Sequence, residues 1–63
     1  MSKRGELLKM YSERGFSFDA MQKTGELLSD MTDSMKEEKA AQIFAILQES
    51  ETEQDFISKM GWS

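Results

Sequence analysis

The segment from Ala40 to Leu47 constrains the fold of this chain more than any other, because seven of its eight residues are apolar. A helix formed by this segment has apolar side chains on almost every side. A chain of 63 residues offers little interior for them, since proteins of about this size bury only roughly 60% of their unfolded surface. We therefore expect one face of this helix to join the protein's own core and the other sides to contact a second chain.

Helical spacing divides the apolar residues between these two roles. The expected core face has the i, i+3, i+4, i+7 spacing of an amphipathic helix and comprises Ala40, Ile43, Phe44 and Leu47. The expected protein interface draws on the other sides of this helix and on apolar residues elsewhere, and it comprises Ala41, Ala45, Ile46, Phe44, Met35, Phe18 and Met21. Six methionines favour such an interface, because methionine is flexible and polarisable and suits adaptable surfaces.

Proline, cysteine and histidine are all absent. Without cysteine the chain has no disulfide and no thiolate ligand, and without histidine a serine nucleophile would need a lysine base beside it. No local spacing singles out such a pair. We therefore expect no catalytic residue, no cofactor and no metal site, which argues against an enzyme.

Three carboxylates, Asp30, Asp33 and Glu37, would share one face of a helix. A calcium-binding EF-hand loop starting at Asp30 needs glycine at its sixth position and glutamate at its twelfth, where Met35 and Ala41 stand. We expect these carboxylates to form a solvated acidic face.

The first two helices have recognisable ends. An apolar stripe predicts the first helix and comprises Leu7, Leu8, Met10 and Tyr11. Gly15 should end this helix. Ser17 is expected to cap a second helix that runs to about Met31, with Phe16 and Met21 as a hydrophobic staple.

The end of the second helix leaves two alternatives open. Ser34 and Glu37 have the spacing of a capping box, which predicts a break at 30–34 and a new helix through the apolar run. If the break fails, 18–49 becomes one long helix that needs a coiled-coil partner.

A last short helix is expected from Ser50 or Thr52 to Gly61, with Trp62 folded back over Ile57. The fold class is therefore all-α. We expect a single domain over 1–63, built as a small helical hairpin or a three- to four-helix bundle that is completed by dimerisation.

The string from Glu6 to Met21 resembles the first helix, turn and second-helix start of a helix-turn-helix of the phage-repressor kind. The resemblance is carried by Leu7, Met10, Gly15, Phe16, Ser17 and Met21. It implies that the helix after Ser17 enters the major groove of DNA, with Arg14 and Lys23 as the candidate nucleic-acid contacts.

The same segment departs from the motif, which usually has a small residue where Gln22 stands. The would-be recognition helix offers Lys23 as its cation, with Asp19 and Glu26 beside it. Phosphate neutralisation supplies most non-specific DNA affinity, so this charge disfavours nucleic acid as a partner.

Charge is distributed unevenly along the chain. Residues 1–24 carry five basic and three acidic side chains, whereas 25–63 carry three basic and nine acidic ones. We expect the acidic part to be a solvated surface, and the alternative is a face for a basic protein surface. The apolar run is too short to cross a membrane and no signal-peptide core follows the N-terminus, so a cytoplasmic location without membrane contact is expected.

These observations predict a small non-enzymatic regulator that binds and modulates a target protein through an apolar helical face, with a homodimer as its expected assembly. Short phage, plasmid and bacterial inhibitors and anti-repressors act in this way. A DNA-binding regulator that uses the Gly15 turn is the first alternative, and a structural or scaffolding helical oligomer is the second.

Overall fold

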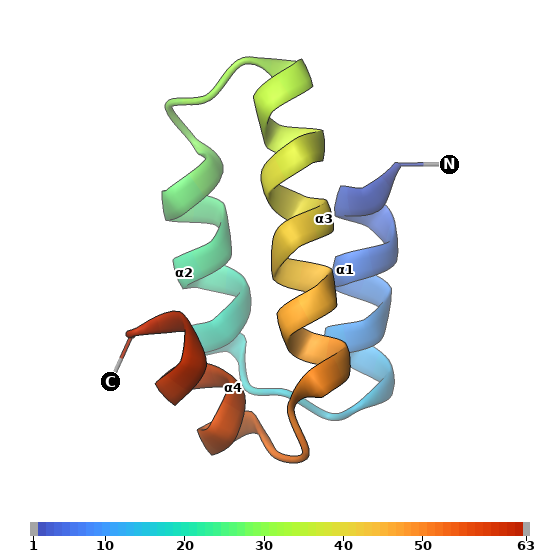
Figure 1. Cartoon of the computed structure of the whole chain (residues 1–63), viewed down its shortest axis with the longest axis vertical. Helices are drawn as coiled ribbons and strands as arrows, with labels where there is room; N and C mark the ends of the chain where they lie inside the picture. The colour runs from blue at the N-terminus through green and yellow to red at the C-terminus, as the bar shows by residue number, and fades with distance from the viewer. Residues whose placement is uncertain (1, 63) are drawn as a thin grey trace.

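Four helices occur in residues 2–62, the part of the chain that the computed structural model describes. They are α1 Lys3–Glu13, α2 Phe18–Leu28, α3 Asp33–Glu49 and α4 Glu53–Met60. Figure 1 shows that α1 and α3 run in the same direction, that α2 runs opposite to them, and that α4 lies across the end of the bundle near the α1–α2 turn. The closest pairings are α1 with α3 and α3 with α4. The predicted all-α helical bundle is thus confirmed.

The first turn is built as the sequence predicts. The backbone N–H of Arg14 donates to the carbonyl of Met10 as α1 ends, and that of Phe16 reaches back to Tyr11 over 2.9 Å. Gly15 has a φ of 69°, a left-handed conformation that glycine adopts without the steric cost of a Cβ atom. Gly15 therefore lets the chain reverse between α1 and α2.

The break between α2 and α3 exists, so the alternative of one long helix over 18–49 is wrong. Two details of the prediction are also wrong. The helix α2 ends at Leu28 rather than near Met31, and the N-cap of α3 is Thr32 rather than Ser34. The Thr32 hydroxyl accepts from the backbone N–H of Met35 at 3.4 Å.

Glu37 explains why the predicted capping box does not form. Its carboxylate accepts the backbone N–H of Lys3 at 2.7 Å and the side-chain Nε of Arg4 at 3.2 Å. Glu37 therefore ties the beginning of α1 to α3 instead of folding back on the start of its own helix.

The last helix begins and ends as expected. Thr52 is its N-cap and accepts from the backbone N–H of Asp55 at 3.1 Å. Gly61, with a φ of 73°, follows its last turn, and the backbone N–H of Trp62 donates to the carbonyl of Ile57 at 3.0 Å. This is the Schellman ending. The indole ring packs edge-on against Phe56, with 5.7 Å between ring centroids.

The core contains side chains from all four helices and from the α1–α2 turn. Its buried members are Leu7, Tyr11, Phe16, Ala20, Ala40, Ile43, Leu47 and Phe56. The expected core face of α3 is confirmed for three of its four residues. Phe44, the fourth, is only partly buried and packs at the edge of the core.

Aromatic rings fill the end of the bundle that α4 covers. Tyr11, Phe16 and Phe56 form a triangle whose ring centroids lie 5.7 to 5.8 Å apart. Aromatic pairs at this spacing add about 0.5–1.5 kcal/mol each beyond the burial of their surface. The short helix α4 is therefore fixed mainly by the fully buried Phe56.

One buried polar link joins α1 to α2. The Tyr11 hydroxyl lies 2.8 Å from Oγ1 of Thr24, and the Thr24 hydroxyl donates to the carbonyl of Ala20 at 2.8 Å. Since Thr24 has one proton and uses it on Ala20, Tyr11 is the donor to Thr24. Burial raises the pKa of the Tyr11 phenol above its ordinary value of 10.0, against the smaller opposing effect of the Thr24 hydrogen bond.

Within residues 2–62, none of the helices combines the length and the apolarity needed to cross a lipid bilayer.

Candidate protein-binding groove

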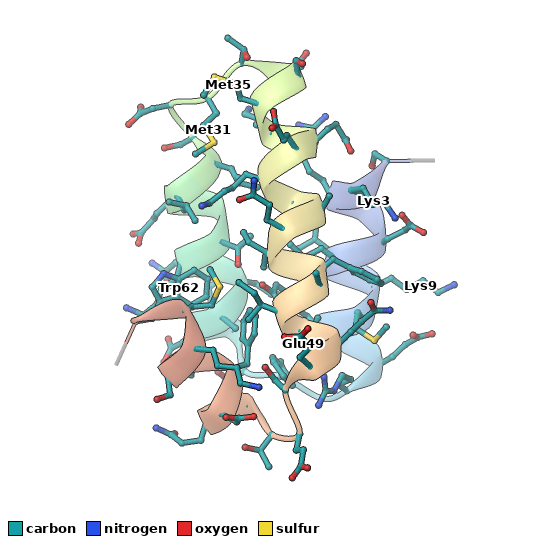
Figure 2. All side chains as sticks on the ribbon, in the orientation of Figure 1. Lys3, Lys9, Met31, Met35, Glu49 and Trp62 are labelled. Atoms are coloured by element: carbon teal, nitrogen blue, oxygen red, sulfur yellow. The ribbon has the colours of Figure 1, made fainter. Side chains whose placement is uncertain are left out.

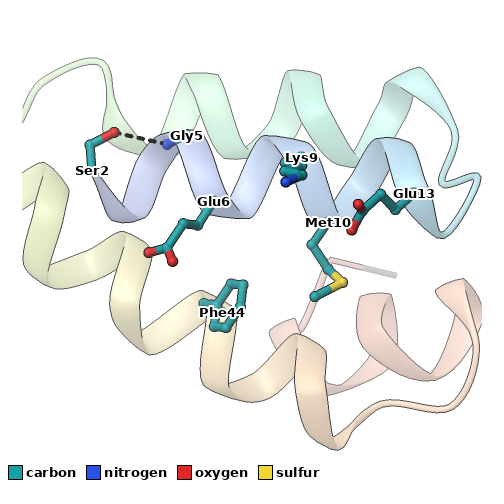
Figure 3. Close-up of a pocket in the computed structure, with 7 residues that line it drawn as sticks. All are labelled: Ser2, Gly5, Glu6, Lys9, Met10, Glu13 and Phe44. Atoms are coloured by element: carbon teal, nitrogen blue, oxygen red, sulfur yellow. Dashed lines mark hydrogen bonds between the residues drawn. The ribbon is translucent and has the colours of Figure 1, made fainter.

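A groove of about 490 Å³ runs along α1 on the side where Phe44 of α3 faces it (Figure 3). We call this the α1–α3 groove. Its lining comprises Ser2, Gly5, Glu6, Lys9, Met10, Glu13 and Phe44. All but Phe44 come from α1 or its N-cap, at the three- and four-residue spacings that place side chains on one side of a helix.

Small groups keep the N-terminal part of the groove open. Ser2 caps α1 by accepting the backbone N–H of Gly5 at 3.0 Å. Gly5 has no side chain, and a Cβ atom at this position would lie 3.2 Å from the Ser2 hydroxyl. Glycine costs helix stability here, but it leaves the cap undisturbed and the groove unfilled.

The floor of the groove is apolar. Met10 and Phe44 are both partly buried. Figure 3 shows the Met10 side chain pointing from α1 toward α3, the helix that carries Phe44. The ammonium group of Lys3 lies 5.4 Å from the centre of the Phe44 ring, a cation–π contact, and 3.4 Å from the Glu6 carboxylate. Phe44 is therefore neither fully buried nor fully exposed, and it lines the groove between the core and the Lys3 ammonium group.

The rim of the groove is charged. Lys9 and Glu13 stand four residues apart on α1, both exposed, and within residues 2–62 neither makes an ion pair or a side-chain hydrogen bond. Lys3 and Lys9 lie on the outer side of α1, away from α2 (Figure 2). Among the lining residues Glu6 and Glu13 are negative and Lys9 is positive, so the lining carries a net charge of −1. Lys3, which lies outside the lining, pairs with Glu6.

The structure does not gather the predicted interface residues into one face. Of the seven, Phe44 alone lines the groove. Met35 is 53% exposed at the start of α3, near Met31 and at the end of the bundle opposite α4 (Figure 2). Phe18 is 73% exposed but opens α2, at the other end.

The remaining four residues of that set are also divided. Met21 and Ile46 are partly buried and pack against the core. Ile46 follows Phe44 by two positions, which places it roughly 160° away around the helix axis. Ala41 is partly buried and Ala45 is exposed on α3. Ala41 precedes Phe44 by three positions and so shares its side of the helix.

Sequence reasoning missed the contribution of α1 to this site. It assigned Met10 to an apolar stripe and took no account of Ser2, Gly5, Glu6, Lys9 and Glu13 as a group. Their helical spacing was visible in the sequence. The position of Phe44 opposite them depends on how α1 packs against α3, and no local pattern reveals that packing. Leu8, also placed in the predicted stripe, is 49% exposed.

The two candidate nucleic-acid contacts have different surroundings. The Arg14 guanidinium donates to the carbonyls of Leu47, Ser50 and Glu51 at 2.7 to 3.1 Å, and it lies 5.2 Å from the centre of the Phe16 ring. It thus satisfies the last carbonyls of α3, where the helix dipole favours a cation. Lys23 is exposed on α2.

Within residues 2–62, no three carboxylates lie close enough together to hold a metal ion. Glu37 is instead bound by Lys3 and Arg4.

Comparisons of this chain with protein-family models, with curated proteins and with solved structures found no match.

Proposed function

We propose that this protein is a small non-enzymatic regulator that binds a target protein in the α1–α3 groove and changes the activity of that target. The observation that supports this proposal is an open groove with an apolar floor, Met10 and Phe44, and a charged rim. Apolar centres with polar rims are the usual anatomy of protein interfaces.

The shape of the groove favours a protein segment over a small molecule. Its volume of about 490 Å³ lies within the range of ligand sites, but it is an open strip with few convergent polar groups. From Ser2 to Glu13 it extends about 16 Å at the rise of an α-helix. This length matches about three turns of a helix laid along α1, the helix-in-groove mode of recognition.

Binding of the target in the groove would itself regulate the target. A chain of 63 residues that covers a functional helix of its target blocks whatever that helix normally binds. Cytoplasmic inhibitors and anti-repressors of phages, plasmids and bacteria work in this manner, and we place this protein with them.

Site-specific photocrosslinking in the native host tests the proposal. A photoreactive amino acid replaces Lys9 or Glu13 on the groove rim, and Gln22 or Gln54 as exposed controls on α2 and α4. We expect the rim positions, and not the controls, to give a covalent adduct with one other protein. Adding the purified protein to that target should then change its activity, and the Phe44→Ala variant should do so less. Equal labelling at all four positions, or no adduct at the rim, would contradict the proposal.

DNA binding remains the second candidate, because α1, the Gly15 turn and α2 do stand in the order of a helix-turn-helix. Its test is a gel-shift assay at low salt. Duplex binding that is lost when Lys23 is changed to Glu would favour it, and absence of binding would remove it.

A further inference from the structure

We propose that the α1–α3 groove is self-complementary and that, without a target, it holds a second copy of this chain related by a two-fold axis. The inference rests on the proposed function in one respect, namely that target and second copy use the same groove. Binding of one then excludes the other.

Charge complementarity between Lys9 and Glu13 carries the inference. The two residues lie on the same side of α1, about one turn apart, with opposite charges and no ion pair within residues 2–62. Two α1 helices that cross antiparallel, with the two-fold axis midway between these positions, place Lys9 of each copy beside Glu13 of the other. A two-fold contact repeats every pair, so one arrangement forms two ion pairs.

The apolar floor fits the same arrangement. Met10 lies about 100° around the helix from Lys9, on the side of α1 that faces Phe44, and both apolar residues line the groove. The ion pairs therefore lie at the axis, and a methionine and a phenylalanine from each copy flank them. Ala41, on the Phe44 side of α3, is small enough to let another chain approach.

The opposite charges of Lys9 and Glu13 on the groove rim favour a second copy over a partner of one charge sign. A strongly basic or strongly acidic partner would meet one attractive and one repulsive residue at Lys9 and Glu13. A second copy meets the opposite charge at both. The overall charge of −4 per chain opposes association only at long range, and salt at about 0.15 M screens that repulsion beyond roughly 8 Å.

Sedimentation equilibrium from micromolar to millimolar concentration tests this inference with charge-swap variants. We expect the parent to dimerise weakly, because a strip about three turns long is a small interface. Lys9→Glu and Glu13→Lys should each raise the dissociation constant about tenfold or more, since like charges then face each other twice. The double variant K9E/E13K should restore the dimer, and an equimolar mixture of the two single variants should associate better than either alone.

Matched controls come from α2, where Lys23 and Glu26 are both exposed and lie outside the groove. Lys23→Glu and Glu26→Lys change the net charge equally and should leave the dissociation constant unchanged. Circular dichroism checks that every variant stays helical. A parent that remains monomeric throughout, assemblies larger than a dimer, or groove variants that behave like the α2 controls would each overturn the inference.

The outcome separates this inference from the proposed function. A photoreactive methionine analogue at Met10, which leaves Lys9 and Glu13 in place, distinguishes an adduct of twice the chain mass from an adduct with another protein. Dimerisation without any adduct to another protein would support the inference and contradict target binding. An adduct to another protein by a strictly monomeric chain would do the reverse.

Discussion

Glu53, the first residue of α4, accepts the backbone N–H and the hydroxyl of Ser17, the N-cap of α2. The N–H contacts are 3.1 and 3.2 Å long. A capping glutamate usually lies three residues into the same helix, whereas this one is 36 residues away in the sequence. Ser17 was predicted to cap α2 with its own side chain, and that detail is wrong because its hydroxyl is directed to Glu53.

Replacing Glu53 should therefore weaken the start of α2. We expect Glu53→Ala to lower the free energy of unfolding by about 1 kcal/mol, the usual cost of losing a helix cap. Glu53→Gln should cost less, because an amide oxygen still accepts. Urea denaturation followed by circular dichroism measures both. Glu26→Ala, at an exposed position of α2, is the control, and an equal loss there would contradict the assignment.

Arg14→Ala should destabilise the protein by about 2 kcal/mol, because it removes hydrogen bonds to three carbonyls at the end of α3. Arg14→Lys should recover part of this loss, since an ammonium group can reach fewer carbonyls than a guanidinium. Thermal unfolding measures the change. Lys23→Ala serves as the matched control, and a wild-type melting temperature for Arg14→Ala would contradict the capping role.

The buried phenol of Tyr11 should make the free energy of unfolding depend on pH in the alkaline range. Burial holds the pKa of its phenol in the folded protein above the ordinary value of 10.0, so the folded protein keeps a proton that the unfolded chain loses. The free energy of unfolding should therefore be unaffected by this group below about pH 10 and should fall as pH rises through the folded pKa.

The sole tyrosine of the chain makes this measurement direct, because phenolate absorbance in the folded protein should titrate with a midpoint above 10.0. Tyr11→Phe should abolish the tyrosine contribution to the pH dependence and cost about 1 kcal/mol at neutral pH. A folded-state midpoint at or below the ordinary value would show that the phenol is not buried.

Replacement by glutamate should destabilise the protein at Ile46 but have little effect at Ala45. Ile46 is partly buried and packs against the core, so Ile46→Glu should lower the free energy of unfolding by about 1–3 kcal/mol. Ala45 is exposed, so Ala45→Glu should change it by less than about 0.5 kcal/mol. Guanidinium denaturation of the two variants checks this, and a fully stable Ile46→Glu protein would place Ile46 on a surface instead.

Local chemistry accounts for what the sequence predicted correctly. Gly15, Gly61 and Thr52 act through their own backbone and immediate neighbours, so their roles could be read directly. The start of α3 was misplaced by two residues because Thr32 and Ser34 are both competent caps. Which of the two caps the helix depends on Glu37. Its carboxylate accepts hydrogen bonds from Lys3 and Arg4, 34 and 33 residues away, and so does not complete a capping box with Ser34.

The groove could not be predicted because it is a product of packing between distant segments. The apolar run correctly indicated a core helix, and Ala40, Ile43 and Leu47 are fully buried. Nothing in the run showed that Phe44 would face Gly5 and Met10. Such pairings are set by the crossing of α1 and α3, which the sequence spacing of either helix alone does not specify.

Glu37, Arg14 and Glu53 each secure the end of a helix that lies 33 to 37 residues away in the sequence. When one helix detaches from the bundle, another helix therefore loses the side chain that stabilises its end. A single protease cut in the link between α3 and α4 would release Phe56 and Glu53 together, and with them the order of α2. We expect digestion to proceed from intact chain to small peptides without a stable fragment, so that the lifetime of this protein in the presence of a protease depends on its first cleavage.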